Sequence, residues 1–319
     1  MIFEKQIVKA YRKTAYSRQD GNATAYYFSS DDFPGLHKLP YSFKSSRRYN
    51  LQGYFYCYDN FIKDRIVIFD HGFGGGHRSY MKEIEKLCAH GYLVFAYDHS
   101  GCMESEGADT NGMAQSLCDL NDCINALKDD EEFEGYDMSV VGHSWGGFST
   151  LNIAALHPDV SHVVAISGFV SVGLLIDSYF RGFLKYYRKA VMRLEKKANP
   201  CFIGCNGVES LSKTDARVLL IYSDNDKMCD KSVHYDALKN GLSNRENVKF
   251  LLESNKGHNP NYTEDAVKYL GEYLAKSKKV KKKLKTDEQK KAFIDSWDWN
   301  RMTAQDDAVW AEIFNCLDS

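Results

Sequence analysis

The sequence predicts an α/β protein with a mainly parallel sheet. Short apolar runs recur along the chain, and they lack the polar alternation of half-exposed strands, which is typical of strands buried on both faces. Helical patterns separate most of these runs, as in repeated βαβ units. The expected strands are 50–58, 65–69, 92–97, 138–141, 163–166, 218–222 and 247–252, and the expected helices are 80–90, 113–129, 148–157 and 262–276.

Local signals support these elements one by one. The first strand is rich in aromatic residues suited to a pleated surface, and the next reads RIVIF. Gly91 follows the first helix as an expected C-cap, and Pro158 ends the helix that precedes it. The remaining runs, such as YLVFAY and VLLIY, are short and almost wholly apolar.

Two segments interrupt the alternation. Residues 169–214 contain no expected strand and have a helical, aromatic and basic character, so they look like an insertion between two strands. In residues 276–285, seven of the ten side chains are lysine. We therefore expect the chain to have four segments. Residues 1–168 form the first half of the core with the N-terminal strands, 169–214 a helical insertion, 215–277 the second half of the core, and 278–319 a Lys-rich linker with a helical tail.

Composition excludes several classes of protein. The chain has 319 residues, of which 44% are hydrophobic and 26% charged, which is close to a soluble globular average and excludes disorder as the main state. The net charge of −2 speaks against nucleic acid as a partner. The longest nearly apolar stretch, 163–176, falls short of the ~20 residues that span a membrane. The lysine run is expected to be a solvated linker or helix end.

The cysteines and the N-terminus bear on location and metals. Nine cysteines lack the paired spacing of zinc sites, and the N-terminal segment lacks the apolar core of a signal peptide. We therefore expect reduced thiols, no metal and a cytoplasmic protein. The tryptophans of the tail are expected to pack on the body, and the tail could also join copies of the chain in a homo-oligomer.

The motif Gly142-His143-Ser144-Trp145-Gly146 is the central chemical feature. It follows an apolar strand and precedes a helix, which is the context of a G-x-S-x-G nucleophile turn. The two glycines leave room for a strained backbone that exposes the serine hydroxyl. We expect Ser144 to be a nucleophile.

A nucleophilic serine needs a base and an orienting carboxylate. On a parallel sheet these partners lie in loops after later strands. His258 follows the last strand and is the expected base. Its competitors are His99 and His234, and His234 is expected to lie on the surface because it begins a helical stretch. The carboxylate is expected to be Asp226, with alternatives in the same loop, namely Asp224 and Asp230.

Backbone N–H groups can stabilise the oxyanion of an acyl-transfer reaction. The N–H of Trp145, directly after the nucleophile, is one candidate. The segment Asp70-His71-Gly72-Phe73-Gly74-Gly75-Gly76 follows a strand, and its glycines allow close approach to a ligand, so the N–H of Phe73 is the second. A phosphate-binding loop is disfavoured, because no Lys-Ser/Thr follows and G-x-G-x-x-G is absent.

The sequence resembles the α/β-hydrolase superfamily in four features, which are HGFGGG, GHSWGG, a late Asp and a late Gly-His. Within the superfamily it most resembles the monoacylglycerol lipases, feruloyl-type esterases and S33 aminopeptidase-like enzymes. The resemblance covers about residues 50 to 275. It implies the α/β-hydrolase fold, with an eight-stranded, mostly parallel sheet flanked by helices and a helical lid inserted after the sixth strand, where residues 169–214 lie. The stretch Tyr97–Gly107 departs from the family's D-x-R-G-x-G-x-S at Ser100 and Met103.

The expected function is cleavage of a small-molecule carboxylic ester by a serine hydrolase through an acyl-enzyme intermediate, without a cofactor. The residues expected to line the substrate site are His71, Gly72, His143, Phe169, Tyr179 and Phe183. One alternative is a peptidase or amidase with an anionic subsite at Glu104 or Glu106. Another is a non-catalytic ligand-binding module on the same fold.

Overall fold

The computed structural model describes residues 3–319 and contains one eight-stranded sheet with the order β1-β2-β4-β3-β5-β6-β7-β8. The β1–β2 and β2–β4 pairs are antiparallel, and the other five pairs are parallel. The strands are β1 (His37–Lys44), β2 (Asn50–Cys57), β3 (Arg65–Asp70), β4 (Leu93–Tyr97), β5 (Asp137–His143), β6 (Val160–Ile166), β7 (Arg217–Ser223) and β8 (Val248–Glu253). The predicted α/β fold with a mostly parallel, eight-stranded sheet is confirmed.

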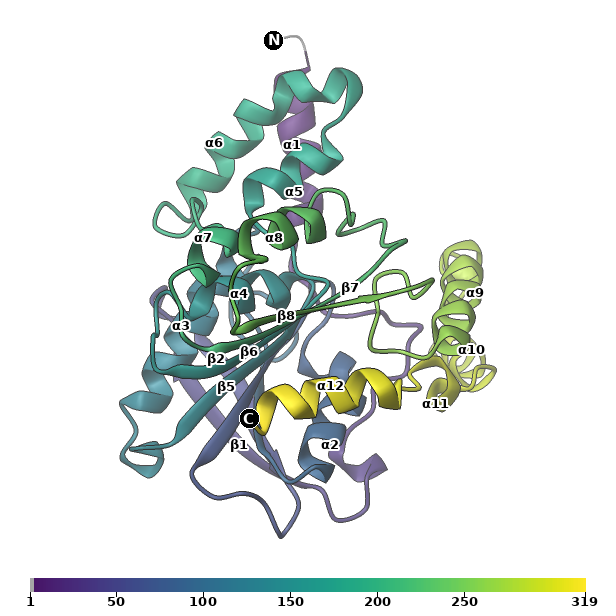
Figure 1. The fold of residues 1–319 in the computed structure, drawn as a ribbon. Coiled ribbons are helices and arrows are strands. Elements are labelled where there is room, and N and C mark those ends of the chain that lie inside the picture. The colour runs from purple at the N-terminus through teal and green to yellow at the C-terminus, as the bar shows by residue number, and fades with distance from the viewer. Residues whose placement is uncertain (1–2) are drawn as a thin grey trace.

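Helices cover both faces of the sheet (Figure 1). The α-helices are α1 (Glu4–Ala15), α2 (Met81–Ala89), α3 (Gln115–Lys128), α4 (Trp145–Ile153), α5 (Val172–Tyr179), α6 (Arg188–Ala198), α7 (Gly207–Leu211), α8 (Tyr235–Leu242), α9 (Glu264–Val280), α10 (Asp287–Asp295), α11 (Trp299–Met302) and α12 (Asp307–Leu317). Residues 3–319 also contain four short 3-10 helices, which are η1 (Ser30–Asp32), η2 (His77–Tyr80), η3 (Glu131–Phe133) and η4 (Gly182–Tyr187).

Two apolar clusters form the core, one on each face of the sheet. Alternation along β3 shows how one strand serves both clusters, because Ile66 and Ile68 belong to one and Val67 and Phe69 to the other. The first cluster takes in side chains of α3, α4 and α8, and the second those of α2 and α12. This burial on both faces explains why the parallel strands read as unbroken apolar runs.

The C-terminal tail is helical and packs on the body of the protein. Trp310 is fully buried in the cluster between the sheet and α12, and α12 contacts β6 and β7. Trp299 packs against Tyr273 of α9, with ring centroids 5.1 Å apart. The lysine run begins inside α9, which continues to Val280.

Helices from two distant parts of the sequence lie together at one end of the molecule. In Figure 1, the N-terminal α1 lies beside α5 and α6, which come from the segment between β6 and β7. The sequence patterns did not predict α1 or β1. The edge strand β1 is mostly exposed, and its Pro and Lys residues obscure the alternation of a strand.

The cysteines and the helix lengths bear on two further expectations. All nine cysteines are free thiols. No helix within residues 3–319 is both long enough and apolar enough to cross a membrane.

Candidate active site

Ser144 lies in a turn of strained backbone between β5 and α4. Its φ of 57° and ψ of −108° are unusual for a residue with a side chain. Its N–H donates to the carbonyl of Ile166 on the neighbouring strand, at 2.9 Å, which fixes the turn against the sheet. The helix that follows begins at Trp145, three residues earlier than expected.

The glycines of the motif are required by close packing. A Cβ on Gly142 would lie 2.2 Å from the Thr150 hydroxyl oxygen, and one on Gly146 would lie 2.0 Å from the carbonyl oxygen of Asp70. Both distances are shorter than any real contact of a Cβ atom. The turn that presents Ser144 therefore depends on glycine at these two positions.

The structure brings Ser144, His258 and Asp226 together. His258 Nε2 lies 2.8 Å from Ser144 Oγ, and His258 Nδ1 lies 2.8 Å from Asp226 Oδ2. The histidine comes from the loop after β8 and the aspartate from the loop after β7, so the ends of three parallel strands supply the three side chains.

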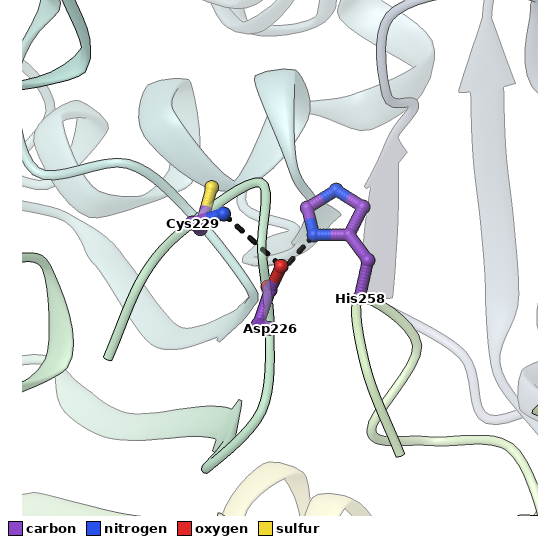
Figure 2. A group of neighbouring side chains, drawn as sticks. All are labelled: Asp226, Cys229 and His258. Atoms are coloured by element: carbon purple, nitrogen blue, oxygen red, sulfur yellow. Dashed lines mark hydrogen bonds and ion pairs between the residues drawn. The ribbon is translucent and has the colours of Figure 1, made fainter. Parts of the chain in front are cut away.

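Asp226 is held in place by several donors (Figure 2). Its Oδ1 accepts hydrogen bonds from the backbone N–H groups of Met228, at 2.7 Å, and Cys229, at 3.1 Å. Burial alone would raise the pKa of this carboxyl group, but the bonds to His258 and the two backbone donors outweigh burial and lower it. Asp226 therefore stays charged next to the imidazole.

Asp226, Cys229 and His258 also have the ligand types of a metal site, and their potential ligand atoms lie within 4.8 Å of one another. However, both carboxylate oxygens of Asp226 already accept hydrogen bonds, one of them from His258. The hydrogen bonds of the three-residue arrangement account for this grouping without a metal ion.

The other carboxylates and histidines that competed for these roles lie elsewhere. Asp224 accepts from the backbone N–H of Asn255, and Asp230 accepts from Ser232. His234, which the sequence suggested to be on the surface, is fully buried, and its Nδ1 accepts from the N–H of Val170 at 3.3 Å. That expectation was wrong.

The residues that carry the two expected oxyanion donors contact each other. Trp145 is the first residue of α4, so its backbone N–H has no acceptor within the helix. Phe73 lies in the loop after β3, and its ring contacts the Trp145 ring with centroids 5.3 Å apart. The contact places the glycine-rich loop against the start of α4.

A cavity of about 310 Å³ opens beside Ser144. Two of the expected substrate-lining residues, Phe169 and Tyr179, line it, whereas Phe183 is 70% exposed and lies outside it. Phe183 belongs to η4, whose inward position is taken by the buried Tyr187. The residues that line the cavity are Tyr11, Thr14, Ala15, Phe73, Met113, Ser144, Trp145, Phe169, Leu175, Ile176, Tyr179, Phe180, Met228 and Cys229.

The other three residues expected to line the substrate site do not line the cavity. They are His71, Gly72 and His143, and their contacts lie within the loops around Ser144. Burial, together with the neighbouring His99, lowers the pKa of His71 to about 3, and its Nε2 accepts from the N–H of His99 at 3.0 Å. His143 is also neutral, because burial lowers its pKa to about 3. The N–H of Gly72 donates to the Tyr80 hydroxyl oxygen at 3.1 Å.

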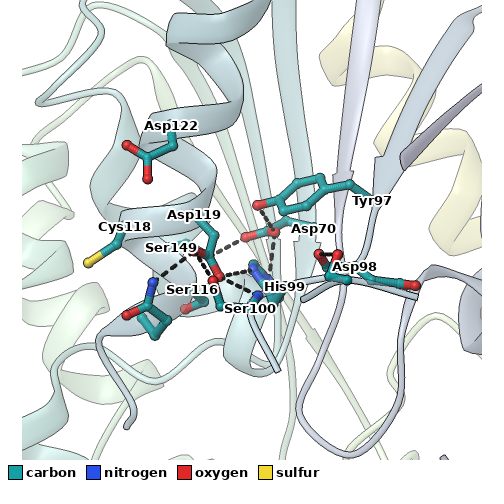
Figure 3. Close-up of polar contacts among 12 residues, drawn as sticks. Asp70, Tyr97, Asp98, His99, Ser100, Ser116, Cys118, Asp119, Asp122 and Ser149 are labelled. Carbon is teal, nitrogen blue, oxygen red and sulfur yellow. Dashed lines mark hydrogen bonds and ion pairs between the residues drawn. The ribbon is translucent and has the colours of Figure 1, made fainter. Parts of the chain in front are cut away.

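Figure 3 shows a buried polar network around His99, and this network contacts α4 through Trp145 and Ser149. His99 forms ion pairs with Asp70, at 2.9 Å, and with Asp119, at 3.4 Å. Burial alone would lower the pKa of His99, but the two carboxylates outweigh it and raise the pKa to about 9. The imidazole of His99 packs on the Trp145 ring with centroids 4.8 Å apart, so the network contacts the residue that follows the nucleophile.

Ser100, one of the two positions that depart from the D-x-R-G-x-G-x-S pattern of the resemblance, belongs to the same network. Its N–H and its hydroxyl group both donate to the Asp119 carboxylate, at 2.8 Å each. The loop after β4 is thereby fixed to α3 without an arginine.

Several residues of the site were not found from the sequence. Tyr80 links the glycine-rich loop to the nucleophile motif, since its hydroxyl oxygen lies 2.9 Å from His143 Nδ1. The N-terminal helix supplies Tyr11 and Ala15 to the cavity. The spacing of Ile7, Tyr11 and Ala15, four residues apart, is the sequence signal that could have revealed this helix.

Comparisons with known proteins agree with this architecture. Residues 62–202 match the family model described as serine aminopeptidase, S33. The esterase Pf2001 of Pyrococcus furiosus superposes with a TM-score of 0.60 at 18% identity, covering 82% of this chain and 98% of that one.

Two further solved structures are similar. The acetyl xylan esterase from Paenibacillus sp. R4 has a TM-score of 0.56 at 16% identity, with 81% of this chain and 88% of that chain covered. Est1E from Butyrivibrio proteoclasticus, solved with ferulic acid bound, has a TM-score of 0.53 at 16% identity and covers 74% of this chain and 98% of its own. The sheet topology, the strained serine turn and these structures show that the chain has the α/β-hydrolase fold, and residues 62–202 are similar to the S33 family.

Proposed function

We propose that the protein is a serine hydrolase that cleaves a carboxylic ester through an acyl-enzyme intermediate. The observation that carries the proposal is the continuous hydrogen-bonded series from Ser144 Oγ through His258 to Asp226, with both distances at 2.8 Å. Nucleophile and base within hydrogen-bond reach, with the base oriented by a third group, are the geometric requirement for this chemistry.

In the proposed reaction, Ser144 Oγ attacks the ester carbonyl carbon while its proton passes to His258 Nε2. The negative charge of Asp226 holds the proton on Nδ1 of His258 and stabilises the imidazolium that forms. The carbonyl oxygen, now negatively charged, accepts from the N–H groups of Phe73 and Trp145.

The attack of Ser144 on the carbonyl carbon gives a tetrahedral intermediate, which then breaks down. The bond to the leaving alcohol breaks, and His258 gives its proton to the alcohol oxygen. Water repeats the sequence with His258 as base, and it releases the carboxylic acid and the free Ser144 hydroxyl. Every proton in this scheme moves between groups of the chain, the substrate and water.

The structure favours an ester over the aminopeptidase alternative. A free amino terminus of a peptide would need an anionic subsite, but no described residue lining the cavity is charged. Glu106 accepts from the N–H of Asn50 at 2.7 Å, and Glu104 accepts from the Tyr54 hydroxyl group. Neither glutamate lines the cavity.

We also propose that residues 169–214 act as a lid, within the four-part division expected from the sequence. This segment follows β6 and contains α5, η4, α6 and α7. The position of this segment supports the proposal, because its residues Phe169, Tyr179 and Phe180 line the cavity beside Ser144.

Steady-state hydrolysis of p-nitrophenyl esters tests the proposed function. Wild-type protein should turn over these esters, and Ser144→Ala should lose roughly 10⁴ to 10⁶ of kcat. Ser243→Ala, at an exposed position after α8, is the matched control and should retain wild-type kinetics. Turnover of amino-acyl amides but not of esters would favour the peptidase, and absence of any turnover would favour a binding module.

A further inference from the structure

The N-terminal helix forms one wall of the cavity beside Ser144. Tyr11, Thr14 and Ala15 of α1 line it together with side chains of α5 and of the loop after β7. Ala15 is buried, while Thr14 is exposed and so lies at the rim. The wall is therefore built by a segment that lies outside both the strand–helix core and the insertion.

A buried carboxylate fixes this wall. Glu195 of α6 is fully buried, and its Oε1 accepts from the Tyr11 hydroxyl group at 2.7 Å. Its Oε2 accepts from the backbone N–H of Met113 at 2.9 Å. One side chain of α6 thus joins α1 to the loop before α3, and both of these contribute residues to the cavity.

The same contacts reach the nucleophile turn. The backbone carbonyl of Met113 accepts from the indole N–H of Trp145 at 2.7 Å. The Tyr11 ring also packs edge-on against Phe180, with centroids 6.0 Å apart. The position of α1 is therefore coupled to both the wall of the insertion and the residue that follows Ser144.

The surface of the cavity suits an aliphatic chain. The polar atoms of its lining are already used, since Thr14 Oγ1 donates to the Ala10 carbonyl at 3.1 Å and the Tyr179 hydroxyl donates to the Met228 carbonyl at 3.3 Å. With the Tyr11 hydroxyl bound to Glu195, the surface offered beyond Ser144 consists of methyl groups, methylene groups, aromatic rings and sulfur. Such a surface disfavours a charged acyl group strongly, because it offers the charge no partner, and disfavours a hydroxylated one by only about 10²-fold.

The volume sets the length of that chain. At about 310 Å³, the cavity lies at the small end of the roughly 300–1,000 Å³ range of small-molecule pockets, which suits an acyl group of intermediate length better than a long one. Part of this space must hold the ester group itself next to Ser144.

We propose that the cavity binds an unbranched aliphatic acyl group of about six to ten carbons, and that α1 is the wall that selects its length. This inference rests on the proposed ester hydrolysis and names its substrate class.

The test compares two identical substitutions on one helix. Ala15→Leu adds bulk at the cavity wall, and Ala10→Leu adds the same bulk at an exposed position of α1 that does not line the cavity. The measurement is kcat/KM for p-nitrophenyl esters from acetate to palmitate. In the wild type, kcat/KM should rise by up to about fourfold per methylene and then fall beyond six to ten carbons.

With Ala15→Leu, the optimum should move two to three carbons shorter, whereas Ala10→Leu should keep the wild-type profile. A wild-type optimum at acetate or at palmitate would overturn the proposal, as would identical profiles for the two variants. Circular dichroism and thermal unfolding check that Ala15→Leu folds. If it does not, Thr14→Leu narrows the same wall at an exposed position, and it should also shorten the optimum.

Binding separates this inference from the proposed function. Calorimetry with octanoate on Ser144→Ala protein measures the cavity without turnover, and the added Ala15→Leu change should weaken binding at least tenfold. Ester turnover without a preference for chain length overturns only the acyl proposal. Octanoate binding that depends on Ala15, without turnover of any ester, overturns the hydrolase and leaves a carrier of such acids. Failure of both overturns both.

Discussion

The imidazole of His143 bonds through Nε2 to the backbone carbonyl oxygen of His258, at 2.7 Å. Because a carbonyl only accepts, Nε2 carries the proton, and Nδ1 accepts from the Tyr80 hydroxyl group at 2.9 Å. Tyr80 in turn accepts from the N–H of Gly72. This series connects the loop of the expected oxyanion donor with the loop of the expected base.

Tyr80→Phe tests whether this series positions the site. The change removes one hydroxyl group and leaves the ring, so kcat should fall roughly threefold to tenfold, while KM stays near the wild-type value because Tyr80 does not line the cavity. The check is steady-state ester hydrolysis.

Tyr58→Phe removes a hydroxyl group that donates to Glu85 at the surface and is the matched control. Equal kcat values for Tyr80→Phe and Tyr58→Phe would contradict a positioning role.

The assignment of the orienting carboxylate has its own test. Asp226→Asn should lower kcat by roughly 10⁴, because a neutral amide can no longer hold the proton on Nδ1 of His258 or stabilise an imidazolium. Asp230→Asn, in the same loop, should leave kcat within about twofold. Since the pKa of Asp226 is lowered, the wild-type carboxylate keeps its charge well into the acid range.

If Asp230→Asn lowers kcat as much as Asp226→Asn does, Asp226 is not the carboxylate that orients His258. Thermal unfolding of both variants separates lost catalysis from lost folding.

His99 makes stability depend on pH. Its pKa is raised to about 9 in the folded protein, compared with about 6.5 in an unfolded chain. Its contribution to stability is therefore complete below about pH 6.5 and is lost as the pH rises towards 9. His99→Gln should cost about 3 to 5 kcal/mol near pH 6, because it leaves Asp70 and Asp119 buried without their cation.

Urea unfolding of wild type and His99→Gln at several pH values measures this difference, which should shrink from pH 6.5 to pH 9. The exposed pair of His37 and Asp59 supplies the control, since His37→Gln should cost less than about 1 kcal/mol. A difference that stays constant over this range would show that His99 is not the titrating group.

The sequence predicted the strands that are buried on both faces of the sheet. Strands such as β3 and β4 are covered on both faces, so their apolar runs are unambiguous. The edge strand β1 is mostly exposed and therefore carries little pattern. Helix α1 has few apolar side chains. Its apolar face, formed by Ile7, Tyr11 and Ala15, is recognisable only once its contacts with the insertion are known.

The candidate site divides in the same way. Ser144 and His258 stand in local motifs whose spacing is readable, and the loop after β7 offered three carboxylates of which Asp226 contacts His258. Tyr80 and Glu195 act through partners distant in the sequence, so no local pattern marks them. Phe183 looked like a cavity residue because it is aromatic, but the backbone of η4 turns it outward.

The most direct test of the account is reaction of the purified protein with a fluorophosphonate, followed by mass spectrometry of the digested chain. We expect one covalent adduct, on Ser144, that is absent from Ser144→Ala and greatly slowed in Asp226→Asn. An adduct on another serine, or no adduct under conditions where a known serine hydrolase is labelled, would contradict the proposal that Ser144 is an activated nucleophile.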